Sequence, residues 1–259
     1  MVRVGTAGWS LPAPWQDRFP EGETHLHAYA RVLDAAEINR TFRKTPRPST
    51  FGRWAGAVPD GFRFSVKVPR RITHDLRLED AGGELDAFLE SVGELDDRLG
   101  PLLIQLPPSL TFDPATASAF LETLRERRVG PDVLEARHAS WFTDRADALL
   151  AEHRVARVAA DPPRADADGR PGGWEGLAYF RLHGRPRIYY SAYREAGSSR
   201  GEAGAAREDD GPAGLAPWLD RIRTAAERAG EVWCVFDNTA AGEGTGDALA
   251  VKGRLAEES

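Results

Sequence analysis

Short apolar runs alternate with amphipathic stretches along most of the chain. Eight runs have the length and residue types of buried strands, and seven stretches have the apolar spacing of helices. This alternation predicts parallel βα units. The predicted strands cover residues 2–6, 35–39, 62–68, 102–106, 133–137, 155–160, 178–182 and 231–236, and the predicted helices cover residues 25–33, 49–57, 84–99, 114–127, 142–153, 215–229 and 240–255.

Eight such units in a chain of 259 residues fit an α/β fold of the TIM type, a parallel eight-stranded (β/α)8 barrel, which typically takes ~250 residues. An open, doubly wound sheet is the alternative. Because no domain-sized linker interrupts the series, we expect one TIM-barrel-like domain over residues 1–259. Residues 162–176 are rich in Pro, Gly and Asp and predict an irregular sixth unit, and residues 195–214 predict a mobile or disordered loop before the last helices.

Polar side chains recur where the apolar runs end. Glu37 and Asn39 lie two residues apart in the second run, so they share one face of the predicted strand. Glu135 and Arg137 repeat this pattern in the fifth run. The carboxyl ends of barrel strands surround the active site, which predicts a common pocket. Other polar residues in this position are Lys67, Gln105, Arg181, His183, Asp237 and Asn238.

A salt-bridged plug is the structural alternative to a pocket. Glu37 paired with Arg137, or Glu135 paired with Arg181, would fill the barrel interior with ion pairs. We favour a pocket, because burying so many charges of both signs is costly. If Glu135 is catalytic, Glu135→Gln should leave folding nearly intact and abolish turnover, whereas a loss of folding would mark Glu135 as structural.

Composition narrows the function classes. The net charge of -6 and the pI near 5.6 argue against a globally basic nucleic-acid-binding protein. The only cysteine, Cys234, lies in an apolar run, which excludes a disulfide framework and predicts a buried thiol in a reducing compartment. Without a charged leader or a membrane-spanning apolar stretch, we expect a soluble, cytoplasmic monomer that binds no membrane. Lysine occurs only at Lys44, Lys67 and Lys252.

Eight short segments spread along the chain form a recognisable set. They are GTAGWS at 5–10, EINRTF at 37–42, FRFSVKVPR at 62–70, ITH at 72–74, GPLLIQLPP at 100–108, EARHASWF at 135–142, YFRLHG at 179–184 and FDN at 236–238. Together they resemble the YecE-like family, which is domain of unknown function seventy-two. The resemblance spans nearly the whole chain and implies a TIM-barrel-like fold, but it implies no activity, because none is established for the family.

The basic residues near the strand ends predict a small anionic ligand, namely a phosphorylated sugar, a nucleotide or another phosphoester. Glu37 and Glu135 are the candidate general base and acid, and His183 could share that role, in hydrolysis or isomerisation of the ligand. The candidate substrate-binding residues are Asn39, Lys67, Arg70, His74, Gln105, Arg137, His138, Trp141, Arg181, Tyr189, Asp237 and Asn238.

Three other functions remain open. Glu37, Glu135, His183 and Asp237 are also the ligand types of a metal-dependent hydrolase or isomerase, as in endonuclease or sugar-isomerase barrels. The sequence requires no cofactor and has no local metal-binding motif, so a divalent metal is an option without assigned ligands. Glu37 and Glu135 could also form a glycosidase pair. A non-catalytic nucleic-acid or phosphometabolite binding protein, using a basic rim, is not favoured. That rim comprises Arg40, Arg43, Lys44, Arg47, Arg53, Arg70 and Arg71.

Overall fold

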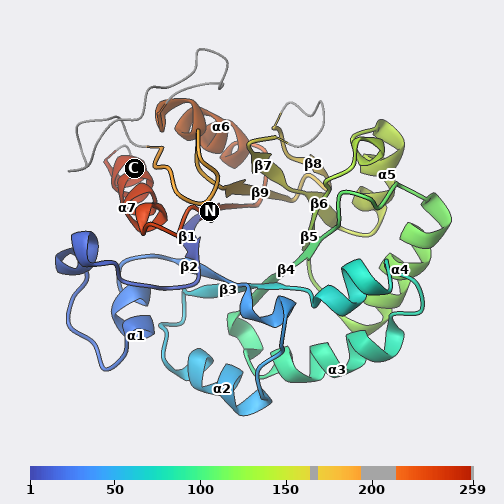
Figure 1. The fold of residues 1–259 in the computed structure, drawn as a ribbon, viewed down its shortest axis with the longest axis horizontal. Coiled ribbons are helices and arrows are strands. Elements are labelled where there is room, and N and C mark those ends of the chain that lie inside the picture. The colour runs from blue at the N-terminus through green and yellow to red at the C-terminus, as the bar shows by residue number, and fades with distance from the viewer. Residues whose placement is uncertain (164–168, 194–213, 258–259) are drawn as a thin grey trace.

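The structure is a computed structural model that describes residues 1–163, 169–193 and 214–257. Its centre is a ten-stranded sheet in the order β7-β9-β10-β1-β2-β3-β4-β5-β6-β8, curved into a nearly closed barrel with the helices around it (Figure 1). All neighbouring strands are parallel except β6 and β8. The strands are β1 (Val2–Ala7), β2 (Ala35–Ile38), β3 (Arg63–Lys67), β4 (Leu99–Gln105), β5 (Asp132–Glu135), β6 (Val155–Arg157), β7 (Ala159–Asp161), β8 (Gly172–Gly173), β9 (Leu177–Leu182) and β10 (Glu231–Phe236).

Helices connect most of the strands and cover the outside of the barrel (Figure 1). Three of them begin at a side-chain cap, because Thr24, Asp113 and Thr143 each accept a hydrogen bond from a backbone N–H in the first turn. The helices are α1 (His25–Ala30), α2 (Pro48–Gly56), α3 (Gly82–Gly93), α4 (Pro114–Arg127), α5 (Asp144–Glu152), α6 (Ala216–Ala226) and α7 (Glu243–Ala256). None of the helices in the described segments has the length and apolar composition needed to cross a lipid bilayer.

The sheet has ten strands where the sequence pattern predicts eight. The predicted sixth strand is divided at Val158, because residues 155–157 pair with β5 whereas residues 159–161 pair with β9. The second addition is β8, which pairs with β6 in the antiparallel direction. It is the only regular element in the described part of the predicted irregular unit at 162–176. The loop predicted at 195–214 lies, apart from Gly214, outside the described residues.

The fourth strand begins earlier than predicted. The helix predicted at 84–99 ends at Gly93, a short 3-10 turn follows at Asp96–Arg98, and β4 already begins at Leu99. Gly100 explains how the strand fits there, because a Cβ atom at this position would lie 2.7 Å from the Trp233 ring inside the barrel. Only glycine lets the β4 backbone pass so close to that ring.

The two faces of the barrel wall differ in chemistry. Outward side chains such as Ile38, Val66 and Leu134 belong to the large apolar core shared with the helices. Inward side chains such as Leu103 and Trp233 form a smaller core inside the barrel. At the carboxyl ends of the strands, the inward positions become polar. Buried polar or charged residues there are Glu37, Ser65, Lys67, Gln105, Glu135 and Arg181.

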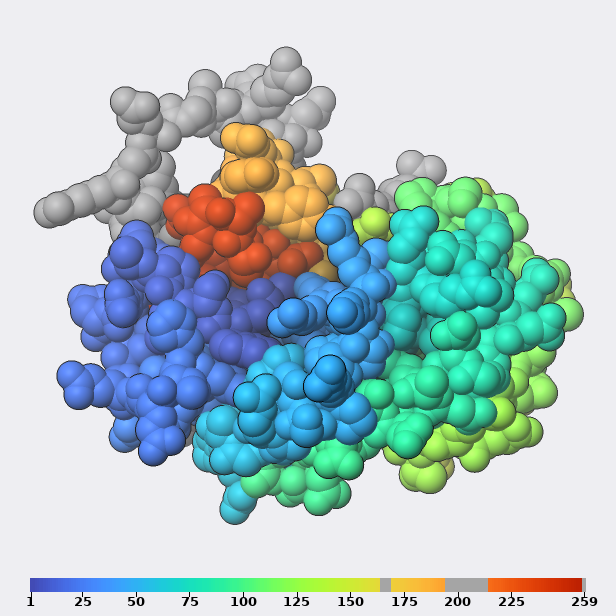
Figure 2. Space-filling model, turned by 60° about the horizontal axis from the view of Figure 1, so that its bottom comes forward, coloured from blue at the N-terminus to red at the C-terminus, as the bar shows by residue number. Residues whose placement is uncertain are grey.

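The first and last parts of the chain lie against each other, since β1 pairs with β10 along its length. Figure 2 shows this as blue N-terminal atoms beside red C-terminal atoms. Cys234, in β10, is fully buried, as predicted, and burial raises the pKa of its thiol.

Candidate functional site

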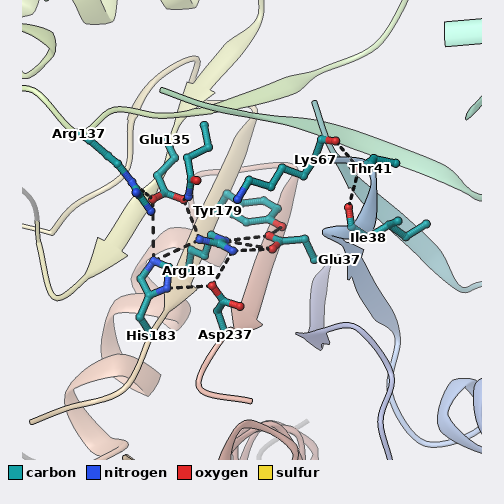
Figure 3. A network of polar contacts seen from close by, with 11 residues as sticks. Glu37, Ile38, Thr41, Lys67, Glu135, Arg137, Tyr179, Arg181, His183 and Asp237 are labelled. Atoms are coloured by element: carbon teal, nitrogen blue, oxygen red, sulfur yellow. Dashed lines mark hydrogen bonds and ion pairs between the residues drawn. The ribbon is translucent and has the colours of Figure 1, made fainter. Parts of the chain in front are cut away.

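Arg181 of β9 lies at the centre of a cluster of charges at the carboxyl end of the barrel (Figure 3). Its Nε and Nη2 atoms donate to the Glu37 carboxylate at 2.9 to 3.1 Å. Nη1 donates to Glu135 Oε2 at 3.0 Å, and Nη2 also donates to Asp237 Oδ2 at 2.7 Å. One guanidinium therefore binds three carboxylates from β2, β5 and the segment after β10.

Further partners complete the coordination of these carboxylates. Tyr179 donates its hydroxyl to Glu37 Oε2 at 2.8 Å. Gln105 Nε2 donates to Glu135 Oε2 at 2.9 Å, and Arg137 Nε donates to Glu135 Oε1 at 3.2 Å. The Nδ1 atom of His183 lies 3.1 Å from Asp237 Oδ2. The cluster therefore corresponds to the salt-bridged plug that was the alternative to a pocket. The predicted pair of Glu135 with Arg181 is present. Glu37 pairs with Arg181 instead of Arg137, and Arg137 pairs with Glu135.

The pKa values within the cluster follow from these contacts. Burial alone would raise the pKa of Glu135, but the charges of Arg181, His183 and Arg137 hold it well below the usual range. Burial would also raise the pKa of Asp237, but nearby charges, mainly that of Arg181, lower it. Burial would lower the pKa of Arg181, but its three carboxylate partners raise it well above the usual value. Glu135 is therefore ionised at neutral pH, and it holds no proton to give as a general acid.

A pocket of about 620 Å³ lies beside the cluster. Its lining contains seven lysine or arginine residues and one carboxylate, Asp237. We call it the cationic pocket. Its lining residues are Asn39, Arg40, Phe42, Arg43, Lys44, Lys67, Arg70, His74, Gln105, Arg137, Arg181, Tyr189 and Asp237.

Lys67, at the end of β3, differs from Arg181 in having no ion-pair partner among the described residues. The residue is only 8% exposed, and its Nζ atom forms no hydrogen bond or ion pair with any residue in the described ranges. Its Nζ atom lies over the Phe42 ring, 4.3 Å from the ring centroid. Burial, followed by the charge of Arg181, lowers the pKa of Lys67 to about 8 against the opposing effect of Glu37, Glu135 and Asp237.

A buried threonine shapes the rim of the cationic pocket. The Thr41 hydroxyl lies 2.5 Å from the Lys67 carbonyl oxygen and 3.2 Å from the Ile38 carbonyl oxygen. These contacts fix the 3-10 turn Arg40–Phe42 over the ends of β2 and β3. The turn thereby brings exposed Arg40, Arg43 and Lys44 to the mouth of the pocket.

His74 enters the pocket from a π-helical turn, Arg71–Asp75, that follows β3. Such turns often occur at functional sites. The imidazole contacts the Phe42 ring edge to face at 5.0 Å, and its Nδ1 atom lies 2.9 Å from the Thr73 hydroxyl. Burial and the nearby cations Arg70, Lys67 and Arg137 lower the pKa of His74, which favours its neutral form.

The structure brings most of the predicted binding residues together. The three predicted catalytic residues, Glu37, Glu135 and His183, do not line the cationic pocket and are fully buried in the cluster beside it. The predicted binding residues that do line it are Asn39, Lys67, Arg70, His74, Gln105, Arg137, Arg181, Tyr189 and Asp237.

Three predicted binding residues do not line the cationic pocket. His138 caps a 3-10 turn by accepting from the Ser140 N–H at 3.2 Å. Trp141 is buried and donates its indole N–H to the Leu110 carbonyl. Asn238 is buried and donates to Asp247 and to the Ser191 carbonyl. His138 and Asn238 each follow a pocket-lining residue by one position, and their hydrogen-bond partners lie outside the pocket lining.

The sequence pattern missed some of the lining. The pattern predicts only a nucleic-acid-binding rim for Arg40, Arg43 and Lys44, which line the pocket. These residues follow the second strand directly, and a position at a strand end is the same signal that predicts the other pocket residues. Phe42 was missed, because its contact with Lys67 depends on the turn held by Thr41.

The arrangement does not fit a metal ion held among Glu37, Glu135 and Asp237. The Arg181 guanidinium already occupies the space among Glu37, Glu135 and Asp237, so a second fixed cation there would be repelled. Within residues 1–163, 169–193 and 214–257, no group of three or more His, Cys, Asp or Glu side chains is arranged to hold a metal ion.

Comparisons with known proteins agree with this fold. The model of a family described as "Protein of unknown function DUF72" matches residues 3–259. The UPF0759 protein YecE from Escherichia coli, in strain K12 and in O157:H7, is 34% identical over 146 residues, which are 55% of this chain and 50% of the relative. The match thus spans about half the length of these curated relatives.

Two solved structures have the same architecture. A DUF72 family protein from Enterococcus faecalis V583 has a TM-score of 0.78 at 21% identity, covering 99% of this chain and 96% of that one. A DUF72 family protein from Thermotoga maritima MSB8 has a TM-score of 0.73 at 26% identity, covering 99% of both chains. Similarity at these identities shows the fold and leaves the chemistry to the site itself.

Proposed function

We propose, from the premise that this chain belongs to the DUF72 family of proteins of unknown function, that its cationic pocket binds a small anionic ligand carrying a phosphate group. The ligand class is a phosphorylated sugar, a nucleotide or another phosphoester. The volume of about 620 Å³ is in the range of small-molecule sites, ~300–1,000 Å³.

The imbalance of charge in the pocket carries this proposal. Among the described residues, seven lysines or arginines and a single carboxylate line it, although the whole chain has a net charge of -6. Arginine forks bind phosphate through paired hydrogen bonds, and a lysine supplies a compact positive charge. Lys67 and the exposed Arg40, Arg43 and Lys44 have no carboxylate partner among the described residues, so a ligand would supply their counter-charge.

Hydrolysis or isomerisation of the ligand by Glu37, Glu135 and His183 gains no support from their geometry. Both carboxylates are bound to Arg181, and neither lines the cationic pocket. The basic groups that face the ligand space and have lowered pKa values are Lys67 and His74. Any turnover is therefore assigned to the pocket-facing groups rather than to the buried carboxylates.

The barrel itself is proposed to be a variant of the (β/α)8 type. In this description β6 and β7 count as one strand that changes partner at Val158, and β8 is an added edge segment. The pocket then occupies the place that active sites take in such barrels.

Titration calorimetry with inorganic phosphate and with glucose 6-phosphate tests the proposal. We expect Lys67→Met to weaken phosphate binding about tenfold or more, because a charge-assisted hydrogen bond contributes roughly 1.5–3 kcal/mol. Lys252→Met is the matched control, since Lys252 pairs with Asp34 outside the pocket and its loss should leave affinity unchanged. Absence of phosphate binding to the unaltered protein, or equal affinity in both variants, would contradict the proposal.

Salt dependence separates this proposal from a nucleic-acid interface at the exposed rim. Binding to a nucleic-acid backbone weakens steeply as salt rises, whereas one phosphate in an enclosed pocket gives a shallow dependence. We expect weak binding of labelled single- and double-stranded oligonucleotides near physiological salt. Tight binding with a steep salt slope would favour the nucleic-acid alternative.

A further inference from the structure

We propose that Lys67 is a nucleophilic amine that forms an imine with the carbonyl carbon of an anionic aldehyde or ketone held in the cationic pocket. The inference rests on the proposed function, because the surrounding arginines must first bind the anionic group. It adds a covalent step and narrows the substrate class to carbonyl compounds that carry a phosphate.

The position of Lys67 supplies the geometry. The residue ends β3 at the carboxyl edge of the barrel, lines the pocket, and extends beside the Arg181 cluster (Figure 3). Its Nζ atom lies over the Phe42 ring and has no hydrogen-bond or ion-pair partner in the described parts of the chain. A cation–π contact leaves N–H groups unsatisfied, so the amine remains available to a ligand in the pocket.

The charges around Lys67 favour the neutral amine that this chemistry needs. Burial is the largest cause, and Arg181 is the next, of a pKa lowered to about 8. A fraction of the amine is therefore unprotonated near neutral pH, unlike an exposed lysine. The charged groups facing it are the cations Arg181, Arg137, Arg70 and His74, when protonated, and the carboxylates Glu37, Glu135 and Asp237.

The composition of the chain provides an independent observation. Of its 34 lysine and arginine residues only three are lysines; Lys44 and Lys67 both line the cationic pocket, and of these two only Lys67 is buried. For phosphate recognition alone, an arginine would form more hydrogen bonds in a fixed fork. Arginine is never deprotonated in proteins, however, and cannot attack a carbonyl carbon. A lysine at this position therefore fits covalent chemistry better than charge alone.

The step balances without an oxidant or a reductant. The Nζ lone pair forms a bond to the carbonyl carbon while the carbonyl π electrons move to oxygen, and one proton passes from nitrogen to that oxygen. The resulting carbinolamine loses its hydroxyl group together with the remaining N–H proton as water, which leaves the C=N bond. The protonated imine withdraws electrons and acidifies the adjacent carbon.

Reductive trapping tests the inference. The protein is incubated with glyceraldehyde 3-phosphate, reduced with sodium borohydride, digested and analysed by mass spectrometry. We expect one adduct per chain at Lys67, formed at least tenfold faster than at Lys44, Lys252 or the Met1 amine. The trapping rate at Lys67 should rise with pH and level off above about 8. Inorganic phosphate should compete, and unphosphorylated glyceraldehyde should react more slowly.

Matched variants separate this inference from the proposed function. Lys67→Arg keeps the charge, so it should retain phosphate binding within a few-fold and lose the adduct. Lys252→Arg, outside the pocket, should retain the adduct. Phosphate binding without a Lys67 adduct would overturn the imine alone. Equal labelling of all amines would also overturn the imine alone. If phosphate neither binds nor competes with labelling, both proposals are overturned.

Discussion

Two buried cations in the same barrel, Arg181 and Lys67, have opposite surroundings. The Arg181 side chain is 1% exposed and its guanidinium binds three carboxylates, whereas the ammonium group of Lys67 contacts an aromatic ring and no carboxylate among the described residues. The pKa of Arg181 is raised and that of Lys67 is lowered, although burial acts in the same direction on both. The difference is therefore due to partners, and it marks Arg181 as structural and Lys67 as available to a ligand.

The largest effect on the free energy of unfolding is expected from removing Arg181, the paired cation. Arg181→Met leaves Glu37, Glu135 and Asp237 close together without their counter-charge, and should lower the free energy of unfolding by about 3–5 kcal/mol. Urea denaturation at pH 7 measures this change. Arg71→Met is the control, since Arg71 is exposed and lies 3.6 Å from exposed Glu84, and it should change stability by less than ~1 kcal/mol. Similar stability of both variants would remove the structural assignment of Arg181.

A smaller loss is expected from Glu135→Gln. The substitution keeps the shape but removes a charge bound by Arg181 and Arg137, and we expect a loss of about 2–3 kcal/mol at pH 7. This outcome differs from the nearly intact folding expected of a catalytic Glu135.

The pH dependence of this loss has a defined sign. The folded-state pKa of Glu135 is lowered, so its stabilising contribution is complete above the ordinary carboxyl value of 4.5 and is lost as the pH falls towards the folded-state value. The difference in unfolding free energy between the unaltered protein and Glu135→Gln should therefore shrink below about pH 4.5. A difference that is constant from pH 7 to pH 3 would show that Glu135 has no favourable partners in the folded state.

The alternation of polar and apolar residues predicted which side chains point into the barrel, because side-chain direction has a period of two in any strand. It correctly brought Lys67, Gln105 and Arg137 to one pocket. It could not predict that Glu37 binds Arg181 rather than Arg137, since partner choice depends on distances across the barrel. Nor could it predict the partner change at Val158, since the pairing of strands depends on contacts between residues far apart in the sequence.

The smallest of the predicted effects on stability should be a gain rather than a loss. Lys67→Met removes a buried cation that has no ion-pair partner among the described residues. We expect the free energy of unfolding at pH 7 to increase by about 1–2 kcal/mol. This is part of the roughly 3 kcal/mol that corresponds to lowering the Lys67 pKa from 10.5 to about 8. Because the folded-state pKa is near 8 and the ordinary value is 10.5, the penalty is full below pH 8 and disappears as the pH rises to 10.5. Urea denaturation from pH 7 to pH 10.5 should show the advantage of Lys67→Met shrinking over that interval. A loss of stability at pH 7 would instead show that Lys67 is paired, and the contrast with Arg181 would then no longer distinguish a binding group from a structural one.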